Sequence, residues 1–295
     1  MVQDTRKRAA PNDRTDRFSG LPYRGTFGAP RPPALDALAL PPDPMPARLG
    51  LRPLKAWRYI GVFGPEFMIC VAAVRIGRAR QSFWAVWDRG DRRLHETTWL
   101  SAGGVQLGPG SARVNDGVAS LQLTFAEGDG VETVCRSGDG YGWTRKQGGI
   151  AVSGTVALAG GAPRAVEGRA VIDDTSAYYQ RHTAWRWCAG VGTDAEGRAL
   201  AWNLVEGVND PVRGSERTVW VDGVPREARP LAIAPSLDAV GDLRFHAEAS
   251  REHRQNLVVV RSRYRQPFGT FSGALPDGSR LSEGYGVMED HDVWW

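Results

Sequence analysis

The residues best suited to acid–base chemistry lie in a strand-like segment near the end of the sequence, residues 283–295. Side chains alternate along a strand, so Glu289 and His291 share one face while Asp290 and Asp292 share the other. A carboxylate two residues from a histidine can hydrogen-bond it and set its proton affinity. Glu289 and His291 are therefore candidate catalytic residues, although a surface cluster of ion pairs explains the same pattern.

Aromatic and polar residues are concentrated in a second segment, 173–209. Residues 183–191 alternate as a strand, 194–197 have the composition of a turn, and 198–206 return as a partner strand, which predicts a β-hairpin. Glu206 is a third candidate catalytic residue. The candidate ligand-binding residues are aromatic and polar members of this segment, with one tyrosine of the final strand: Asp173, Tyr178, Arg181, His182, Trp185, Trp187, Trp202, Asn203, Asn209 and Tyr285. Both a ligand pocket and a plain barrel wall, whose indole N–H groups find backbone acceptors, are consistent with this composition.

The elements that must position these residues are predicted to be β-strands throughout. The 36 glycines and 11 tryptophans suit many short strands joined by tight turns. Residues 1–49 are rich in Pro and Arg and are expected to form an extended arm that begins with a disordered tail over 1–17. We expect two tandem antiparallel β-barrel or curved-sandwich halves, 50–169 and 170–295, with the candidate site in the second. The stretch 175–181 is the one plausible short helix, which Asp173 or Asp174 would cap.

Composition excludes several functional classes. The net charge of +4 comes from arginines scattered among acidic residues, so no nucleic-acid partner is expected. The three cysteines are far apart and the five histidines show no ligand spacing, so no disulfide scaffold and no metal site are predicted. The run Gly190-Val-Gly192-Thr-Asp-Ala195 resembles a dinucleotide fingerprint, but a turn and a strand follow it instead of a helix. No cofactor is therefore expected.

The sequence also has no run of about 18 apolar residues that would cross a membrane. The basic run Arg6-Lys7-Arg8 is followed by polar residues, which argues against a secretory signal. We therefore expect a cytoplasmic protein without stable membrane insertion. Homo-oligomer formation is left open.

Several motifs together resemble the bacterial family described as domain of unknown function 2804, and the resemblance covers about residues 49–295. The motifs are Lys55-Ala-Trp57-Arg-Tyr59, Ile172-Asp-Asp174, Arg181, Thr183-Ala-Trp185-Arg-Trp187, Gly190-Val-Gly192, Trp202-Asn-Leu-Val-Glu-Gly207, Ser215-Glu-Arg-Thr-Val-Trp-Val-Asp-Gly223, Gln266-Pro-Phe-Gly269 and Gly284-Tyr-Gly-Val-Met-Glu-Asp-His291. This family carries no established reaction. More distantly, two Trp-rich halves in tandem are similar to lipocalin-like calycin proteins such as carotenoid hydratases and tocopherol cyclases, a likeness of fold alone.

This resemblance implies a Trp-lined cavity, inside one barrel or between the two, that binds a hydrophobic small molecule of terpenoid, polyketide or fatty-acyl type. The alternative is a cofactor-independent hydratase, cyclase or isomerase that acts on an alkene-bearing lipid. In that enzyme a buried Glu206 or Glu289 would protonate the substrate, His291 would act as base or proton relay, and Asn203 would orient. A buried carboxylate without a cationic partner favours the enzyme, and pairing of both glutamates with arginines such as Arg181 or Arg186 favours a carrier or a purely structural role.

Overall fold

The computed structural model describes residues 16–256 and 260–295. In these residues the chain forms β-strands and two single turns of 3-10 helix, η1 (Asp16–Phe18) and η2 (Pro33–Leu35), so the predicted all-β class is confirmed. No helix among them is long and apolar enough to span a membrane. The tail predicted over 1–17 falls almost entirely outside the described residues.

The first sheet contains eleven antiparallel strands and curls strongly. Its order is β7-β6-β5-β4-β13-β12-β10-β9-β8, and β11 joins β1 to β12. The strands are β1 (Tyr23–Thr26), β4 (Lys55–Phe63), β5 (Phe67–Ile76), β6 (Ala79–Asp88), β7 (Arg93–Trp99), β8 (Val105–Gly108), β9 (Ser111–Asn115), β10 (Ala119–Phe125), β11 (Val131–Ser137), β12 (Gly140–Leu158) and β13 (Arg164–Ala177). A separate small ribbon pairs β2 (Arg48–Leu49) with β3 (Arg52–Pro53).

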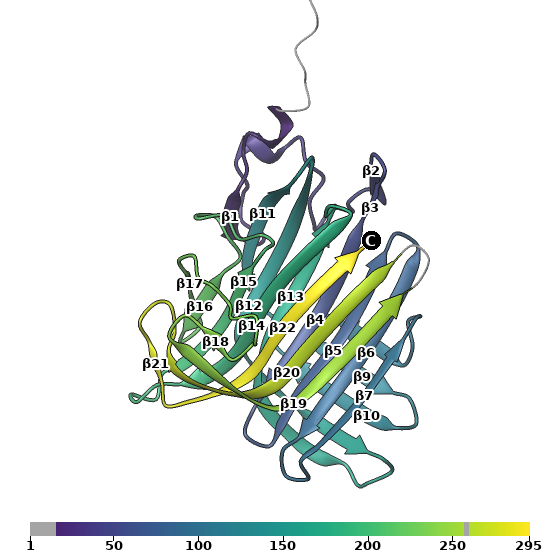
Figure 1. Cartoon of the computed structure of the whole chain (residues 1–295), viewed down its shortest axis with the longest axis vertical. Helices are drawn as coiled ribbons and strands as arrows, with labels where there is room; N and C mark the ends of the chain where they lie inside the picture. The colour runs from purple at the N-terminus through teal and green to yellow at the C-terminus, as the bar shows by residue number, and fades with distance from the viewer. Residues whose placement is uncertain (1–15, 257–259) are drawn as a thin grey trace, which may run out of the picture.

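The second sheet contains nine antiparallel strands in the order β17-β16-β15-β14-β22-β20-β19-β18, with β21 against β20. Its strands are β14 (His182–Thr193), β15 (Ala199–Glu206), β16 (Thr218–Val221), β17 (Val224–Glu227), β18 (Ala239–Val240), β19 (Leu243–Asn256), β20 (Arg261–Ala274), β21 (Arg280–Leu281) and β22 (Glu283–Trp294). The predicted hairpin is formed by β14 and β15. Figure 1 shows β22 between β14 and β20, which lie far apart in the sequence.

The predicted helix over 175–181 is wrong, and Asp173 and Asp174 cap nothing. Both aspartates lie inside β13, which pairs with β4 and β12 along most of its length. The first sheet therefore continues to Ala177, and the expected domain boundary at 169/170 falls within one of its strands. The chain passes to the second sheet between Ala177 and His182.

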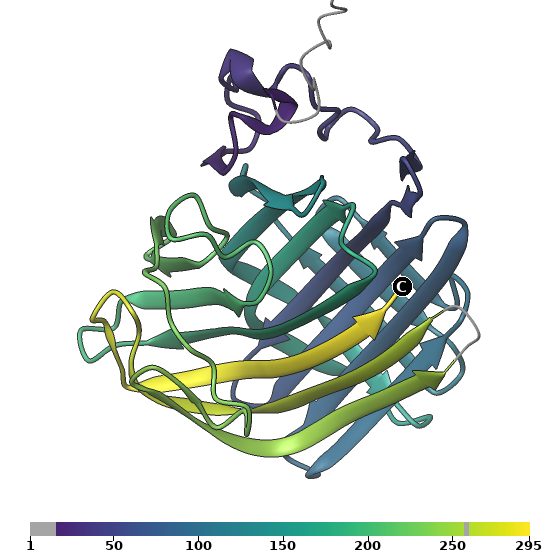
Figure 2. The same ribbon diagram turned by 45° about the horizontal axis from the view of Figure 1, so that its top comes forward.

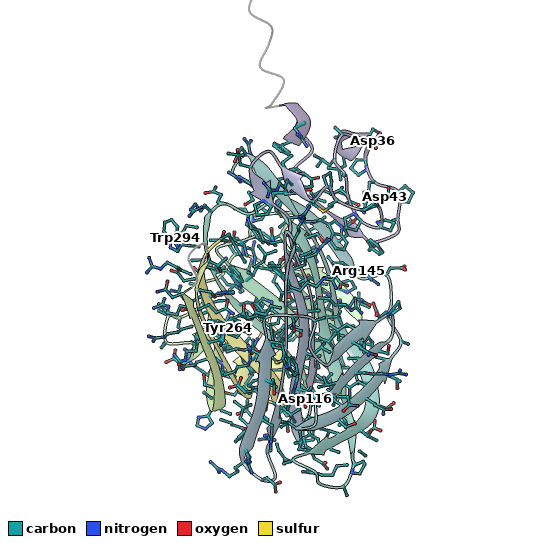
Figure 3. All side chains as sticks on the ribbon, turned by 90° about the vertical axis from the view of Figure 1, so that its right-hand side faces the viewer. Asp36, Asp43, Asp116, Arg145, Tyr264 and Trp294 are labelled. Carbon is teal, nitrogen blue, oxygen red and sulfur yellow. The ribbon has the colours of Figure 1, made fainter. Side chains whose placement is uncertain are left out.

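The two sheets pack face to face, and alternation along the strands distributes the side chains among three cores. One core lies inside the curl of the first sheet, around Ile60 and Trp84. A second joins the sheets and contains Tyr59 of the first and Trp187 of the second. A third covers the far side of the second sheet, around Trp202. Figure 2 shows the strands of one sheet running obliquely over those of the other, and Figure 3 views the two layers edge-on.

The segment before β4 packs along the edge of this structure as the predicted extended arm. β1 pairs with β11, and the buried side chains of Leu35 and Leu38 join Tyr141 and Tyr178 in a small core of their own. The Tyr141 hydroxyl donates to the Ala39 carbonyl at 2.9 Å. These contacts fix the arm at one end of the sheets, where Figure 1 shows it in purple.

Candidate functional site

A cavity of about 130 Å³ lies in the layer where the two sheets meet. Its walls come from β4, β5, β6, β12 and β13 of the first sheet and from β14, β15, β19, β20 and β22 of the second. The interior of the first sheet's curl is instead filled by apolar side chains. The cavity therefore lies between the two sheets and not inside one barrel. Both placements were open from the sequence.

Strand register builds the wall that the second sheet contributes. Tyr264 of β20 lies opposite His253 of β19 on one side and His291 of β22 on the other, and His291 lies opposite Trp185 of β14. Two residues further along the strands, Glu289 lies opposite Trp187. Because side chains repeat every second residue, all of these point to the same face. The predicted placement of Glu289 and His291 on one face is confirmed.

Aromatic rings from both sheets meet across the cavity. Trp57 of β4 stacks on Trp185 with ring centroids 6.1 Å apart and planes 7° from parallel, and it also stacks on Tyr179. Tyr59, two residues further along β4, packs edge-on against Trp187 at 5.3 Å. Each ring has its partner on the opposite sheet or its border, so the sheets hold the aromatic walls rigidly.

Glu289 is a buried carboxyl group with neutral partners. Trp185 Nε1 donates to one carboxyl oxygen at 2.9 Å and Gln266 Nε2 donates to the other at 3.1 Å. Burial raises the pKa of Glu289 to about 7, against the lowering effect of the Trp185 hydrogen bond. No lysine or arginine among the described residues forms an ion pair with it. The group can therefore hold a proton near neutral pH, as a general acid must.

His291 lines the same cavity but is not hydrogen-bonded to Glu289. Its Nε2 is 2.8 Å from the Ser262 hydroxyl, and its ring packs against Trp185 at 4.4 Å. Burial lowers the pKa of His291 to about 3. The imidazole is therefore neutral at ordinary pH and is a weak base.

A second group of charges lies at the border of the cavity. The buried Lys146 ammonium forms ion pairs with Asp173 at 2.5 Å and Glu216 at 3.3 Å. Burial alone would lower the pKa of Lys146, but the two carboxylates raise it. Asn209 donates to Glu216 and to the Tyr179 hydroxyl. The cluster satisfies its own charges and ties β12, β13 and the loop after β15 together.

In the part of the chain that the structure describes, no group of three or more His, Cys, Asp or Glu side chains is arranged to hold a metal ion. The three cysteines are buried free thiols. The residues at the cavity offer aromatic surface, hydroxyl groups, the Glu289 carboxyl group and, at the border, the charged side chains of the Lys146 cluster.

The profile of the family described as "Domain of unknown function (DUF2804)" matches residues 118–295. The chain belongs to this family. The matched range is shorter than the resemblance expected from about residue 49. Among curated proteins, no sequence matches this chain.

Several solved structures resemble this DUF2804 member in fold at low sequence identity. A protein assigned as AttH from Nitrosomonas europaea is 14% identical, with a TM-score of 0.49 over 86% of this chain and 98% of the other. Kievitone hydratase from Nectria haematococca is 10% identical, with a TM-score of 0.47 over 80% and 88%. CghA is 11% identical, with a TM-score of 0.45 over 82% and 88%. Similarities this low assign no activity to the chain.

Six of the residues selected from the sequence line the cavity, and the others lie elsewhere. The lining residues are Glu289, His291, Trp185, Trp187, Asn209 and Asp173. Asn203 also faces the layer between the sheets but does not line the cavity; its side-chain oxygen accepts a hydrogen bond from Trp187 Nε1 at 2.8 Å. Trp202 faces the far side of the second sheet and donates to the Cys188 sulfur.

The remaining selected residues make structural contacts outside the cavity. Glu206 is 3.7 Å from Arg186 and accepts the Ile233 amide, so it has the arginine partner that a structural role implies. Tyr178 donates to the Pro46 carbonyl in the core of the arm. Three residues lie on other surfaces: Arg181 is exposed in the connection before β14, His182 stacks on Trp294 on the outer face, and Tyr285 donates to Glu283.

Several cavity residues were missed by sequence reasoning. Trp57 and Tyr59 alternate in a motif that carried the family resemblance, so their shared face was a usable signal. Tyr264 and Arg251 alternate in ordinary strands with no distinguishing pattern. Lys146 gave no signal, since a lysine is seldom buried.

Proposed function

We propose that this protein binds a small, largely apolar molecule in the cavity between its sheets. The observation that carries the proposal is the aromatic enclosure formed by Trp57, Tyr59, Trp185 and Trp187, with rings from both sheets facing one space. Apolar cavities of roughly 150 Å³ hold a benzene molecule, and this one measures about 130 Å³. A single ring or the branched end of a terpenoid, polyketide or fatty-acyl chain matches that space.

Titration with α-methylstyrene, a one-ring alkene, tests the proposal by tryptophan fluorescence. Trp185→Ala removes one wall and exposes about 50 Å² of bound ligand, which at 25 cal/mol per Å² weakens binding about tenfold. Trp294→Ala is the matched control, because Trp294 lies on the outer face against His182. Equal affinity in the wild type and Trp185→Ala, with both folded by circular dichroism, would refute ligand binding in this cavity.

Acid catalysis on an alkene is a second candidate function, and the environment of Glu289 favours it. Burial raises the pKa of Glu289 to about 7 despite the lowering effect of the hydrogen bond from Trp185, so this carboxyl group holds a proton near neutral pH. Its proton would pass to the terminal alkene carbon, and the faces of Trp57 and Trp185 would stabilise the resulting carbocation. Water would then add to the cation and return a proton to the Glu289 carboxylate. We assign His291, a weak base, to orienting the water through Ser262.

The test of this second function uses the same probe. Hydration of α-methylstyrene gives 2-phenylpropan-2-ol, which gas chromatography with mass detection quantifies. Glu289→Gln keeps the side-chain volume and should abolish the alcohol while α-methylstyrene still binds. Turnover that survives Glu289→Gln would exclude Glu289 as the acid, and binding without any turnover in the wild type would leave the carrier function alone.

A further inference from the structure

We infer that the molecule bound between the sheets carries a carbonyl oxygen, which the hydroxyl groups of Tyr59 and Tyr264 bind. The inference rests on the proposed function, since it names the chemical class of the ligand of the same cavity. It concerns recognition and holds for a carrier as well as for an enzyme.

The two hydroxyl groups are buried and lack partners. Tyr59 is 6% exposed, and neither its hydroxyl nor that of Tyr264 has a hydrogen-bond partner among the described residues. The Tyr264 hydroxyl approaches the Glu289 carboxyl without the geometry of a hydrogen bond. Buried polar groups in native proteins are nearly always paired, so two unpaired hydroxyls lining one cavity indicate a partner that enters it.

Packing fixes where these hydroxyl groups lie. Tyr59 packs edge-on against Trp187. Tyr264 packs edge-on against His291 at 5.2 Å and at a tilt against Phe83 at 6.3 Å. Tyr59 comes from the first sheet and Tyr264 from the second, and both line the cavity. The two rings therefore contribute to the cavity wall from opposite sheets, and neither ring can turn away to find another partner without disturbing the core.

The protonation states make this end of the cavity a hydrogen-bond donor. Burial raises the pKa of both Tyr59 and Tyr264 well above the ordinary value, so both hydroxyls keep their protons. The Arg251 guanidinium lies over the Tyr264 ring at 5.1 Å and over the Phe83 ring at 4.0 Å, which adds a positive charge beside them. The Arg251 charge is itself paired with Glu96 at 2.9 Å, so the two hydroxyl groups are the donors that a ligand oxygen complements.

The size of the cavity limits which carbonyl compounds it can bind. A volume of about 130 Å³ is close to that of an apolar cavity that holds one benzene molecule, so the part of the ligand enclosed here is a single ring with its carbonyl at the rim. A carbonyl conjugated to such a ring would place its apolar part against Trp57 and Trp185 and its oxygen at the tyrosines. Aryl ketones and cyclic enones are compounds of this class.

Acetophenone and α-methylstyrene form the matched probe pair, because they differ only by a carbonyl oxygen in place of a methylene group. We expect Tyr59→Phe and Tyr264→Phe each to weaken acetophenone binding roughly fivefold to tenfold, the value of one hydrogen bond, and to leave α-methylstyrene binding unchanged. Tyr285→Phe is the control, since the Tyr285 hydroxyl contacts Glu283 outside the cavity. Binding is measured by ligand-observed NMR on the full-length chain.

The two probes separate the failure of this inference from that of the proposed function. Intact α-methylstyrene binding also shows that each variant is folded. If α-methylstyrene binds and the ratio of the two affinities is the same in the wild type and both Tyr→Phe variants, the carbonyl inference is wrong while ligand binding stands. If neither probe binds the wild type, the proposed function fails and the inference fails with it.

Discussion

The buried Glu289 carboxyl group makes the stability of this protein depend on pH in a definite direction. Burial raises its pKa from 4.5 to about 7, so the folded chain holds a proton that the unfolded chain releases between those values. Since the folded state binds more protons in that window, the free energy of unfolding falls as pH rises through it. The contribution of this proton to the free energy of unfolding is complete below pH 4.5. By pH 8 it has been lost, and at 1.36 kcal/mol for each pKa unit the loss amounts to about 3 kcal/mol.

Glu289→Gln removes this titration and keeps the side-chain volume. Its amide oxygen can accept from Trp185, and its amide nitrogen can donate to Gln266 once the Gln266 amide turns its oxygen towards it. We expect the free energy of unfolding of the variant, measured relative to that of the wild type, to rise by about 2–3 kcal/mol between pH 5 and pH 8. The assay is urea unfolding of both proteins at the two pH values, because every other titrating group contributes equally and cancels in the comparison. Glu206→Gln is the control for removing a carboxyl group from a half-exposed position beside Arg186. Parallel pH profiles for the wild type and Glu289→Gln would refute the reasoning about burial.

Three further substitutions have expected outcomes that urea unfolding checks. Lys146→Met leaves the Asp173 and Glu216 carboxylates buried without their cation and should cost roughly 3–5 kcal/mol; a loss below about 1 kcal/mol would show that the cluster is not desolvated. Tyr264→Phe should stabilise the ligand-free protein by about 1 kcal/mol because it removes an unpaired buried hydroxyl, and a clear loss would mean that the hydroxyl has a partner. His291 has a pKa lowered to about 3, so its stabilising contribution is complete above pH 6.5 and is lost as pH falls from there towards 3. His291→Gln should therefore flatten the acid side of the stability profile, and an unchanged acid side would contradict the burial of the imidazole.

Local pattern was sufficient to predict which face of one strand a residue occupies. The alternation of Glu289 and His291 in β22 and the hairpin of β14 and β15 both follow from residues close in sequence. Pairing register across the hairpin was not predictable in the same way. Trp202 lies opposite Gly190 and not opposite Trp187, which turns its indole to the far side of the sheet.

The remaining contacts of the site depend on pairing between strands that are far apart in the sequence, so local pattern could not predict them. β22 lies between β14 and β20, and this order brings Tyr264 and Trp185 to either side of His291 although 79 positions separate them. Contacts between sheets, such as Trp57 on Trp185, depend on how two whole sheets pack. The short helix was mispredicted because pairing with β4 and β12 extends β13 through residues that favour a cap or turn.

The most direct test of a ligand cavity between the sheets uses the indole N–H groups of the 11 tryptophans as reporters in nitrogen-15 correlation NMR. Assignments of Trp57, Trp185, Trp202 and Trp294 come from single Trp→Phe variants. Titration with α-methylstyrene should shift the Trp57 and Trp185 signals saturably and leave those of Trp202, in the far core, and Trp294, on the outer face, unchanged. Saturable shifts confined to Trp202 or Trp294, or no saturable shift at any indole, would contradict a ligand site between the sheets.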